Sequence, residues 1–396
     1  MAANAPADLK ALPAAVPQRL LLGPGPQNAS PRVHAAMSLP LLGHMDPSFL
    51  AIADEVKQLL RYVWQTENEF TLPISGSASA AWEASVANLT EPGDVHVVFS
   101  AGYFGSRAAD MHARYGADVR VVEKEYGEVF TLAEIEEALA IHAPALAWLC
   151  HAETSTGALQ PVAGVGAACR RAGCLLLLDT VTSLCGVPVL IDEWQVDAAY
   201  AGTQKCIGVP PGISALTLND RALAKMSDRK SAVTSWYLDL GMIRAYLGTG
   251  ANRVYHHTAP VAMMYGLREG LAIVAEEGLQ RRWEAHRSNA ELLWRELEAI
   301  GLECMVPAEN RLPPLTTVWV PPDIDGAALV ADMREKFQIE IGGALGPLRG
   351  KVWRLGLMGY NSRREVVLSL VACLADCLRR QRGQSLGPCP RARSRL

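Results

Sequence analysis

The fold of this chain follows from the stretch Cys174-Leu-Leu-Leu-Leu-Asp179 and from Asp197-Ala-Ala-Tyr-Ala-Gly-Thr-Gln-Lys205, which comes soon after it. Each stretch contains a short apolar run that is followed by a polar, reactive side chain. A run that is apolar throughout is typical of a strand buried on both faces, as in a parallel sheet covered by helices. Ligands of such sheets gather at the carboxyl ends of the strands. Asp179 and Lys205 are therefore the first candidates for a functional site.

The same pattern extends over residues 22–218. Apolar runs alternate there with helical periods, which predicts a mostly parallel sheet between layers of helix. The stretch Phe49–Thr66 shows the helical period, because its apolar residues recur at three- and four-residue steps. The predicted strands are Phe70–Ile74, Val95–Ser100, Asp118–Val122, Leu146–Cys150, Cys174–Leu178, Ala198–Ala201 and Ile213–Leu218.

Beyond Pro260 the pattern changes to long helices with a few strands. We expect helices at Val261–Glu277, Gln280–Ile300 and Arg363–Arg380, and strands at Thr316–Val320 and Lys351–Leu357. The predicted class is α/β, with a large domain on a mostly parallel seven-stranded sheet and a smaller C-terminal α+β domain. The expected division is an N-terminal arm at 1–19, a large domain at 20–278, a small domain at 279–382 and a flexible tail at 383–396.

Composition argues against several classes of function. The 396 residues include 37 Lys and Arg against 41 Asp and Glu, a formal net charge of −4, so the overall charge does not favour binding to nucleic acid. The nine cysteines are scattered without a Cys-x-x-Cys pair, which is typical of reduced thiols in an intracellular compartment. No apolar run reaches the ~20 residues of a membrane span. We therefore expect a globular protein with neither nucleic acid nor membrane as a partner.

A third strand end carries hydroxyls and small residues. The predicted strand Phe70–Ile74 is followed by Ser75-Gly76-Ser77-Ala78-Ser79, just before a helical stretch. Free N–H groups at a helix N-terminus can bind a phosphate, although such a turn by itself is more often a simple cap. Together with Asp179 and Lys205, this turn completes what pyridoxal phosphate requires: a lysine for the Schiff base, an acid for the ring nitrogen and a phosphate site.

With these groups in order along the chain, the sequence resembles the class V aminotransferases of pyridoxal-phosphate fold type I, and within them the alanine–glyoxylate (serine–pyruvate) branch. The resemblance covers about Leu21 to Leu374. It rests on the joint order and spacing of several fragments. These are Leu22-Gly-Pro-Gly-Pro26, Gly43-His-Met-Asp-Pro47, Ile74-Ser-Gly-Ser77, Thr154-Ser-Thr-Gly157, Asp179, Gly202-Thr-Gln-Lys205, Tyr255-His-His-Thr258 and Arg354-Leu-Gly-Leu-Met-Gly-Tyr-Asn361.

The resemblance implies a role for each site residue. Lys205 would form the internal aldimine and carry the proton between the substrate Cα and the cofactor, while Asp179 would pair with the pyridine nitrogen. Gly25 and Arg354 would bind substrate, Arg354 by holding the α-carboxylate with its planar fork. The other cofactor-binding residues that it implies are Ser77, Ala78, Ser79, Phe104, Thr154, Val181, Gln204, Tyr255 and Thr258.

Partners and location are further expectations. Tyr255 and Thr258 match residues that reach the phosphate of the neighbouring subunit's cofactor, which implies a homodimer with shared active sites. The chain ends in Ser394-Arg395-Leu396, a close variant of the Ser-Lys-Leu address, which predicts binding to the peroxisomal import receptor and a peroxisomal location.

No metal is expected. The adjacent His256 and His257 should point to different sides of a strand or helix, and no third ligand has suitable spacing.

The implied activity is ping-pong transfer of an amino group to glyoxylate, which makes glycine. L-Alanine is the first donor, L-serine the second, and pyruvate is a further candidate substrate. Three positions depart from the animal members, because Phe104, Ser79 and Thr154 stand where those have Trp, His and Ser. Several alternatives stay open: serine or ureidoglycine as the donor, a cysteine-desulfurase-like or lyase reaction, and a dimeric cofactor-binding scaffold without turnover.

Overall fold

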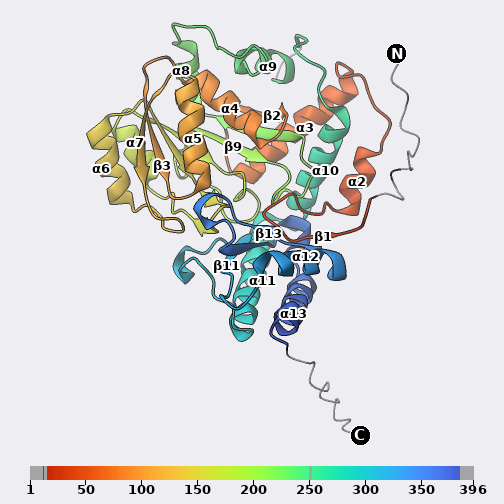
Figure 1. Ribbon diagram of the computed structural model, residues 1–396. Coiled ribbons are helices and arrows are strands. Elements are labelled where there is room, and N and C mark those ends of the chain that lie inside the picture. Colours follow the sequence, from red (N-terminus) through yellow and green to blue (C-terminus); the bar gives the residue numbers. More distant parts are fainter. Residues whose placement is uncertain (1–11, 13–15, 249–251, 384–396) are drawn as a thin grey trace, which may run out of the picture.

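The computed structural model describes residue 12 and residues 16–248 and 252–383, and the structural statements below concern these residues. Figure 1 shows a large sheet flanked by helices, with a smaller group of strands and helices beneath it. The predicted terminal signal Ser394-Arg395-Leu396 and most of the predicted arm and tail lie outside the described residues.

The large sheet has seven strands in the order β2-β10-β9-β8-β5-β3-β4. Within it β10 runs antiparallel to both of its neighbours, and the pairs among β3, β4, β5, β8 and β9 are parallel. The predicted α/β class with a mostly parallel seven-stranded sheet is therefore confirmed. The strands are β2 (Phe70–Ser75), β3 (Val95–Ser100), β4 (Asp118–Glu123), β5 (Leu146–Cys150), β8 (Leu175–Asp179), β9 (Ala198–Gly202) and β10 (Ile213–Leu218).

Helices cover this sheet, and their ends follow from the local sequence. In α3 (Pro47–Trp64), Asp46 caps the first turn by accepting from Ser48 N. Proline occupies the first helical position, where a backbone N–H would have no partner within the helix. The remaining helices of this part are α2 (Pro31–Met37), α4 (Ala78–Leu89), α5 (Tyr103–Arg114), α6 (Leu132–His142), α7 (Val165–Arg171), α8 (Asp220–Ser227), α9 (Leu240–Leu247) and α10 (Val261–Glu277).

The C-terminal part has an apolar core of its own. An antiparallel sheet of β11 (Leu315–Trp319), β14 (Val352–Gly356) and β13 (Gly342–Gly343) accompanies α11 (Leu279–Ala299), α12 (Gly326–Phe337) and α13 (Arg364–Gln381). The core residues of this part include Leu293, Leu355, Val367 and Leu374.

One N-terminal segment crosses to the C-terminal part. Strand β1 (Leu20–Leu21) pairs in parallel with β12 (Ile339–Glu340), and Leu22 packs in the C-terminal core. These residues fall within 20–278, the predicted large domain, yet they pack with the smaller part. The division of the chain at 278 stays a prediction.

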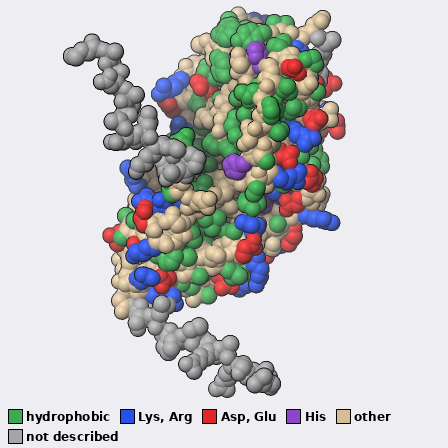
Figure 2. Space-filling view, turned by 90° about the vertical axis from the view of Figure 1, so that its right-hand side faces the viewer, with side chains coloured by type: hydrophobic (Ala, Val, Ile, Leu, Met, Phe, Trp, Pro, Cys, Tyr) green, Lys and Arg blue, Asp and Glu red, His purple; other side chains and the backbone are tan. Residues whose placement is uncertain are grey.

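The remaining elements are short. Strands β6 (Ala152–Glu153) and β7 (Ala158–Leu159) form a small hairpin, and single 3₁₀ turns lie at Ala308–Asn310, Gly346–Leu348 and Gly359–Asn361. Figure 2 shows one face of the molecule, on which exposed apolar side chains form patches among charged ones. Among the described residues, none of the helices combines the length and the apolar character of a membrane span.

Candidate active site

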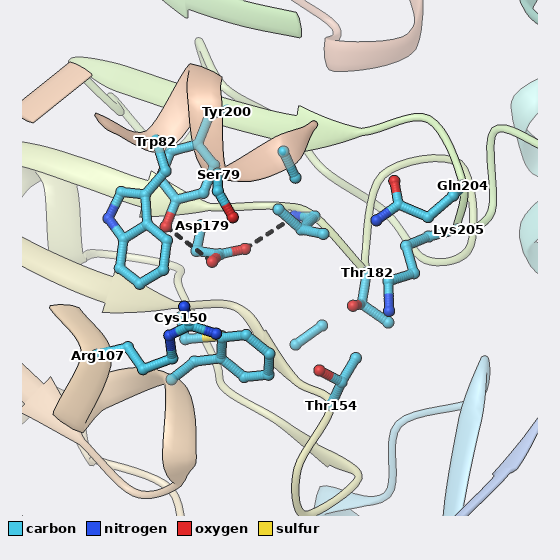
Figure 3. Close-up of a pocket in the computed structure, with 14 residues that line it drawn as sticks. Ser79, Trp82, Arg107, Cys150, Thr154, Asp179, Thr182, Tyr200, Gln204 and Lys205 are labelled. Atoms are coloured by element: carbon cyan, nitrogen blue, oxygen red, sulfur yellow. Dashed lines mark hydrogen bonds between the residues drawn. The ribbon is translucent and has the colours of Figure 1, made fainter. Parts of the chain in front are cut away.

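A cavity opens at the carboxyl ends of β5, β8 and β9. Figure 3 shows Asp179 near the middle of its side chains, with Lys205 and Gln204 on one side and Trp82 on the other. The lining residues are Ala78, Ser79, Trp82, Phe104, Arg107, Cys150, Ala152, Thr154, Asp179, Val181, Thr182, Tyr200, Gln204 and Lys205.

Asp179 is the last residue of β8, and two donors orient its carboxylate. Oδ1 accepts from Val181 N at 2.8 Å, and Oδ2 accepts from the Tyr200 hydroxyl at 2.8 Å. Burial raises the pKa of Asp179 to about 6, while these two hydrogen bonds oppose the rise. The carboxyl is therefore mostly ionised at neutral pH and is ready to hold a cationic group in the cavity.

Tyr200 and two tryptophans form a rigid wall behind that carboxylate. Trp148 Nε1 donates to the Tyr200 oxygen at 3.0 Å, and an indole N–H can only donate, so the tyrosine proton is directed to Asp179. The Trp82 ring stacks on Trp148 and on Tyr200, each with ring centres 5.7 Å apart.

Lys205 follows β9 and is held from its main chain and its side chain. Gln27 Nε2 donates to the Lys205 carbonyl at 2.7 Å, and the Lys205 amine contacts the Pro24 carbonyl. Gly25 has a φ of +99°, a backbone conformation that favours glycine, and it lies so close to the lysine that a Cβ there would be 2.8 Å from Lys205 Nζ. Burial first, and then the charge of Arg354, lower the pKa of Lys205 to about 8. A substantial fraction of this amine is therefore neutral and nucleophilic at mildly alkaline pH.

The N-terminus of α4 forms another wall. Ser77 is the N-cap but makes no side-chain cap bond within the described residues; Ala80 N donates to the Ser77 carbonyl, which leaves the N–H groups of Ala78 and Ser79 available to a ligand. Gly202 lies between Gln204 and this helix end. A Cβ at position 202 would lie 2.7 Å from Gln204 Oε1 and 2.9 Å from Ala78 Cβ. Gln204 Oε1 is buried and has no hydrogen-bond partner in the part of the chain that the structure describes.

Arg354 reaches the site from β14 of the C-terminal part. Its Nε donates to the Gly343 carbonyl at 2.8 Å, and its Nη1 donates to the Thr154 carbonyl at 3.0 Å. Burial lowers the pKa of Arg354, and the charge of Glu153 opposes that change. The guanidinium therefore has a fixed plane and keeps donors for a carboxylate ligand.

Tyr255 and Thr258 lie apart from this cavity. Both are exposed, and the Tyr255 ring lies 5.2 Å from the His44 ring. The Nδ1 atoms of His256 and His257 lie 2.8 Å apart, while the Nε2 atom of His256 faces the Trp236 carbonyl and that of His257 faces the Ser75 hydroxyl. The segment is an irregular loop, so the alternation of a strand does not apply. Within residues 16–248 and 252–383, no group of three His, Cys, Asp or Glu is arranged to hold a metal.

Most of the predicted site residues come together. Eight of them line the cavity: Ala78, Ser79, Phe104, Thr154, Asp179, Val181, Gln204 and Lys205. Ser77, Gly25 and Arg354 adjoin it through the contacts described above, whereas Tyr255 and Thr258 do not. The roles assigned to these residues stay predictions.

The sequence reasoning missed Trp82, Arg107, Cys150, Ala152, Thr182 and Tyr200. Trp82 could have been found, because it lies in the first turn of the helical stretch that follows Ser79, three residues beyond that serine. The position of Tyr200 beside Asp179 depends on the pairing register of two strands, which the sequence does not reveal.

Comparisons with known proteins agree with this geometry. The family model described as aminotransferase class-V matches residues 34–366. The alanine–glyoxylate aminotransferase of Felis catus is 45% identical over 379 residues, covering 95% of this chain and 91% of its own. The (S)-ureidoglycine–glyoxylate transaminase of Bacillus subtilis (strain 168) is 37% identical over 382 residues, covering 92% and 91%.

A solved structure is similar over nearly the same length. The alanine–glyoxylate aminotransferase from Nostoc sp. superposes with a TM-score of 0.93 at 52% identity, covering 96% of this chain and all of that one.

Proposed function

Because the chain belongs to the class-V aminotransferase family and is thus an aminotransferase that uses pyridoxal phosphate, we propose that it transfers the amino group of L-alanine to glyoxylate, forming pyruvate and glycine. The observation that carries the proposal is the meeting of Lys205 and Asp179 in one cavity, in a chain that is 45% identical to an alanine–glyoxylate aminotransferase.

The residues of the cavity fit pyridoxal phosphate. The buried Gln204 Oε1 has no hydrogen-bond partner among the described residues, and the Gln204 amide would offer N–H groups to a phosphate beside the N-terminus of α4, which lacks a side-chain cap. Asp179 offers a carboxylate to a protonated ring nitrogen, and Lys205 offers an amine to an aldehyde. When bound, this cofactor supplies an aldehyde that links covalently to amines and a ring that accepts the electrons released at Cα.

The chain's own residues then divide the work. Lys205 Nζ, with its pKa lowered to about 8, takes the proton from Cα of the donor and later returns a proton to the acceptor side. Asp179 stabilises positive charge on the ring nitrogen through a carboxylate that Val181 N and Tyr200 keep oriented. Arg354 orients the substrate by its carboxylate, which alanine and glyoxylate share.

A homodimer is part of the proposal. Tyr255, 58% exposed, and the exposed Thr258 contribute to the phosphate site of a second copy of the chain. Support comes from exposed large apolar side chains on the same loop surface, since apolar surface of this kind is typical of an interface. Val254 precedes Tyr255, and the exposed rings of Trp236 and Tyr237 stack on the neighbouring His256.

Import into peroxisomes is also proposed, on the basis of Ser394-Arg395-Leu396. A fluorescent fusion that ends in these residues should collect in peroxisomes. The same fusion without them should stay diffuse, and equal distributions would contradict the proposal.

The test of the activity is a donor panel with glyoxylate as the acceptor. We expect L-alanine to give the highest kcat/KM, L-serine to follow, and Lys205→Ala to reduce kcat by 10²-fold or more, the range typical of general acid–base groups. Pyridoxal phosphate should still bind to Lys205→Ala. A variant with a near-normal rate would contradict the assignment of Lys205.

(S)-Ureidoglycine is the second candidate donor. The Bacillus subtilis relative, 37% identical over nearly the whole chain, favours it. The same panel separates the two functions, because a ureidoglycine enzyme would use that donor with at least tenfold higher kcat/KM than L-alanine.

A further inference from the structure

Glu153 is a buried carboxylate beside the cavity, and the reaction described above gives it no task. It ends β6 and immediately precedes Thr154. The residue is 6% exposed, and burial raises the pKa of its carboxyl. Burying a carboxylate is costly unless hydrogen-bond donors surround it, so the donors around Glu153 indicate which part of the structure it stabilises.

Both oxygens of Glu153 accept hydrogen bonds. Oε1 accepts from the main-chain N of Ser155 at 2.9 Å and from the Ser155 hydroxyl at 2.7 Å. Oε2 accepts from the main-chain N of Phe104 at 3.3 Å. The Ser155 hydroxyl in turn accepts from Tyr103 N at 2.9 Å.

These bonds provide acceptors for the first N–H groups of α5, and the acceptors come from the end of β6 and the turn that follows it rather than from the helix itself. The first N–H groups of a helix have no partner within the helix, and its N-cap residue usually supplies one. The N-cap of α5 is Gly102, which has no side chain, and the donors of Tyr103 and Phe104 turn to Ser155 and Glu153 instead. A negative charge at this end also interacts favourably with the helix dipole.

Gly102 makes this approach possible. Its φ of −177° is ordinary extended backbone, so its conformation does not require glycine. Space does, because a Cβ there would lie 2.4 Å from Cγ of Glu153 and 2.7 Å from its Oε2. The pairing of Gly102 with Glu153 therefore replaces a local cap with a remote carboxylate.

We propose that Glu153 is a positioning residue, which caps α5 from a distance and thereby holds the Phe104 ring against the cofactor. Phe104 is the second residue of α5, so a shift of this helix end moves its ring directly. The proposal rests on the proposed function and on the stacking role predicted for Phe104. It extends the site to a residue that touches neither substrate nor cofactor.

The test is the affinity of the apo-enzyme for pyridoxal phosphate, measured by absorbance titration in Glu153→Asp. Aspartate keeps the charge, but its shorter side chain withdraws from Phe104 N. We expect the Kd to rise about tenfold, as loss of a charge-assisted hydrogen bond would give. In a Phe104→Ala background the same change should raise the Kd less than twofold, because the ring that Glu153 positions is gone.

Glu134→Asp is the matched control. Glu134 also caps a helix, α6, through the Thr131 capping box, but it lies outside the cavity lining. Its substitution should change the Kd less than twofold. Thermal unfolding of each apo-variant checks folding. If Glu153→Asp does not fold, Ser155→Ala takes its place, because it removes the partner of Tyr103 N. Ser155→Ala should raise the Kd at least threefold when Phe104 is intact, and not in the Phe104→Ala background.

Each remaining outcome is decisive. If the unmodified enzyme binds the cofactor, an unchanged Kd in both Glu153→Asp and Ser155→Ala would contradict the role of Glu153 but not the proposed function. An equal rise with and without Phe104 would mean that Glu153 acts elsewhere and would also overturn it. Failure of the unmodified enzyme to bind pyridoxal phosphate would contradict the proposed function as well.

Discussion

Asp179 and Lys205 place opposite charges in one cavity, and burial acts on both. The pKa of Asp179 rises to about 6 and that of Lys205 falls to about 8, so the two values approach each other across neutral pH. Groups shifted in this way are typical of sites that move protons, because each can change its protonation state near the working pH. Burial destabilises the charged form of Lys205, and the same effect makes its amine available as a base near neutral pH.

Replacement of Lys205 should therefore stabilise the apo-enzyme in a pH-dependent manner. The pKa of Lys205 is about 8 in the folded state against an ordinary value of 10.5, so the unfolded chain binds more protons between these pH values. The unfolding free energy of the unmodified enzyme consequently rises with pH over this window. Lys205→Met has no charge to bury and should be more stable below pH 8 by up to about 3 kcal/mol.

Urea unfolding of both apo-forms from pH 7 to pH 11 measures this difference. We expect it to shrink toward zero above pH 10.5, where the lysine is neutral in both states. A difference that does not vary with pH would contradict the shifted pKa of Lys205.

Arg354 yields a second prediction at the residue level. Lys cannot donate at once to the Gly343 and Thr154 carbonyls and to both oxygens of a substrate carboxylate, as the arginine fork can. Arg354→Lys should raise KM for L-alanine and for glyoxylate by tenfold or more, since loss of a buried charged contact costs about 2–5 kcal/mol. Steady-state kinetics with each substrate varied in turn provides the measurement, and unchanged KM values would remove Arg354 from the site.

At the level of elements, the site is assembled from ends: the carboxyl ends of β5, β8 and β9 and the N-termini of α4 and α5. The strand ends bring reactive side chains, α4 brings a helix N-terminus without a side-chain cap bond, and α5 brings the Phe104 ring on a helix end that Ser155 and Glu153 cap. Small shifts of these ends therefore change the cavity more than substitutions within the elements.

The start of α5 can be tested through its glycine. Gly102→Ala places a methyl group against the Glu153 carboxylate and should displace the helix end, lowering the affinity for pyridoxal phosphate about tenfold, equivalent to ~1.4 kcal/mol. Gly43→Ala is the control, because its Cβ would meet only Asp46 Cβ at 4.0 Å. Cofactor titration of both apo-variants should show the loss in the first only, and equal affinities would contradict the tight fit at Gly102.

Long periodic elements could be predicted from the sequence, and short paired ones could not. The limits of β3, β5, β10 and α10 match the predicted ranges, because each has a clear apolar pattern over its length. Strands β1, β12 and β13 were missed, since two residues carry no period. The lining residue Tyr200 was missed for a related reason: its place beside Asp179 depends on the pairing register of two strands rather than on any local motif.

At the level of the whole molecule, one N-terminal segment joins the two parts at the site. Leu22 O accepts from Gly356 N of β14, and Gln27 Nε2 donates to the Lys205 carbonyl. The segment thus contacts both the strand that carries Arg354 and the loop that carries Lys205. A change in the relative position of the two parts would move these two side chains with respect to each other.

The shared sites of the proposed dimer predict complementation between inactive variants. If Tyr255 and Thr258 serve the partner's cofactor, a hybrid of Lys205→Ala with the double variant Tyr255→Ala and Thr258→Ala contains one intact site. Mixed and refolded subunits should regain up to half the activity per hybrid dimer, although each parent is weak. Activity no greater than the average of the two parents would show that these residues do not act across subunits.

The covalent link to Lys205 tests the central claim most directly. Enzyme loaded with pyridoxal phosphate is reduced with borohydride, digested and analysed by peptide mass spectrometry. The account predicts a single modified peptide, with the cofactor on the ε-nitrogen of residue 205. Label on a different lysine, with residue 205 unmodified, would contradict it.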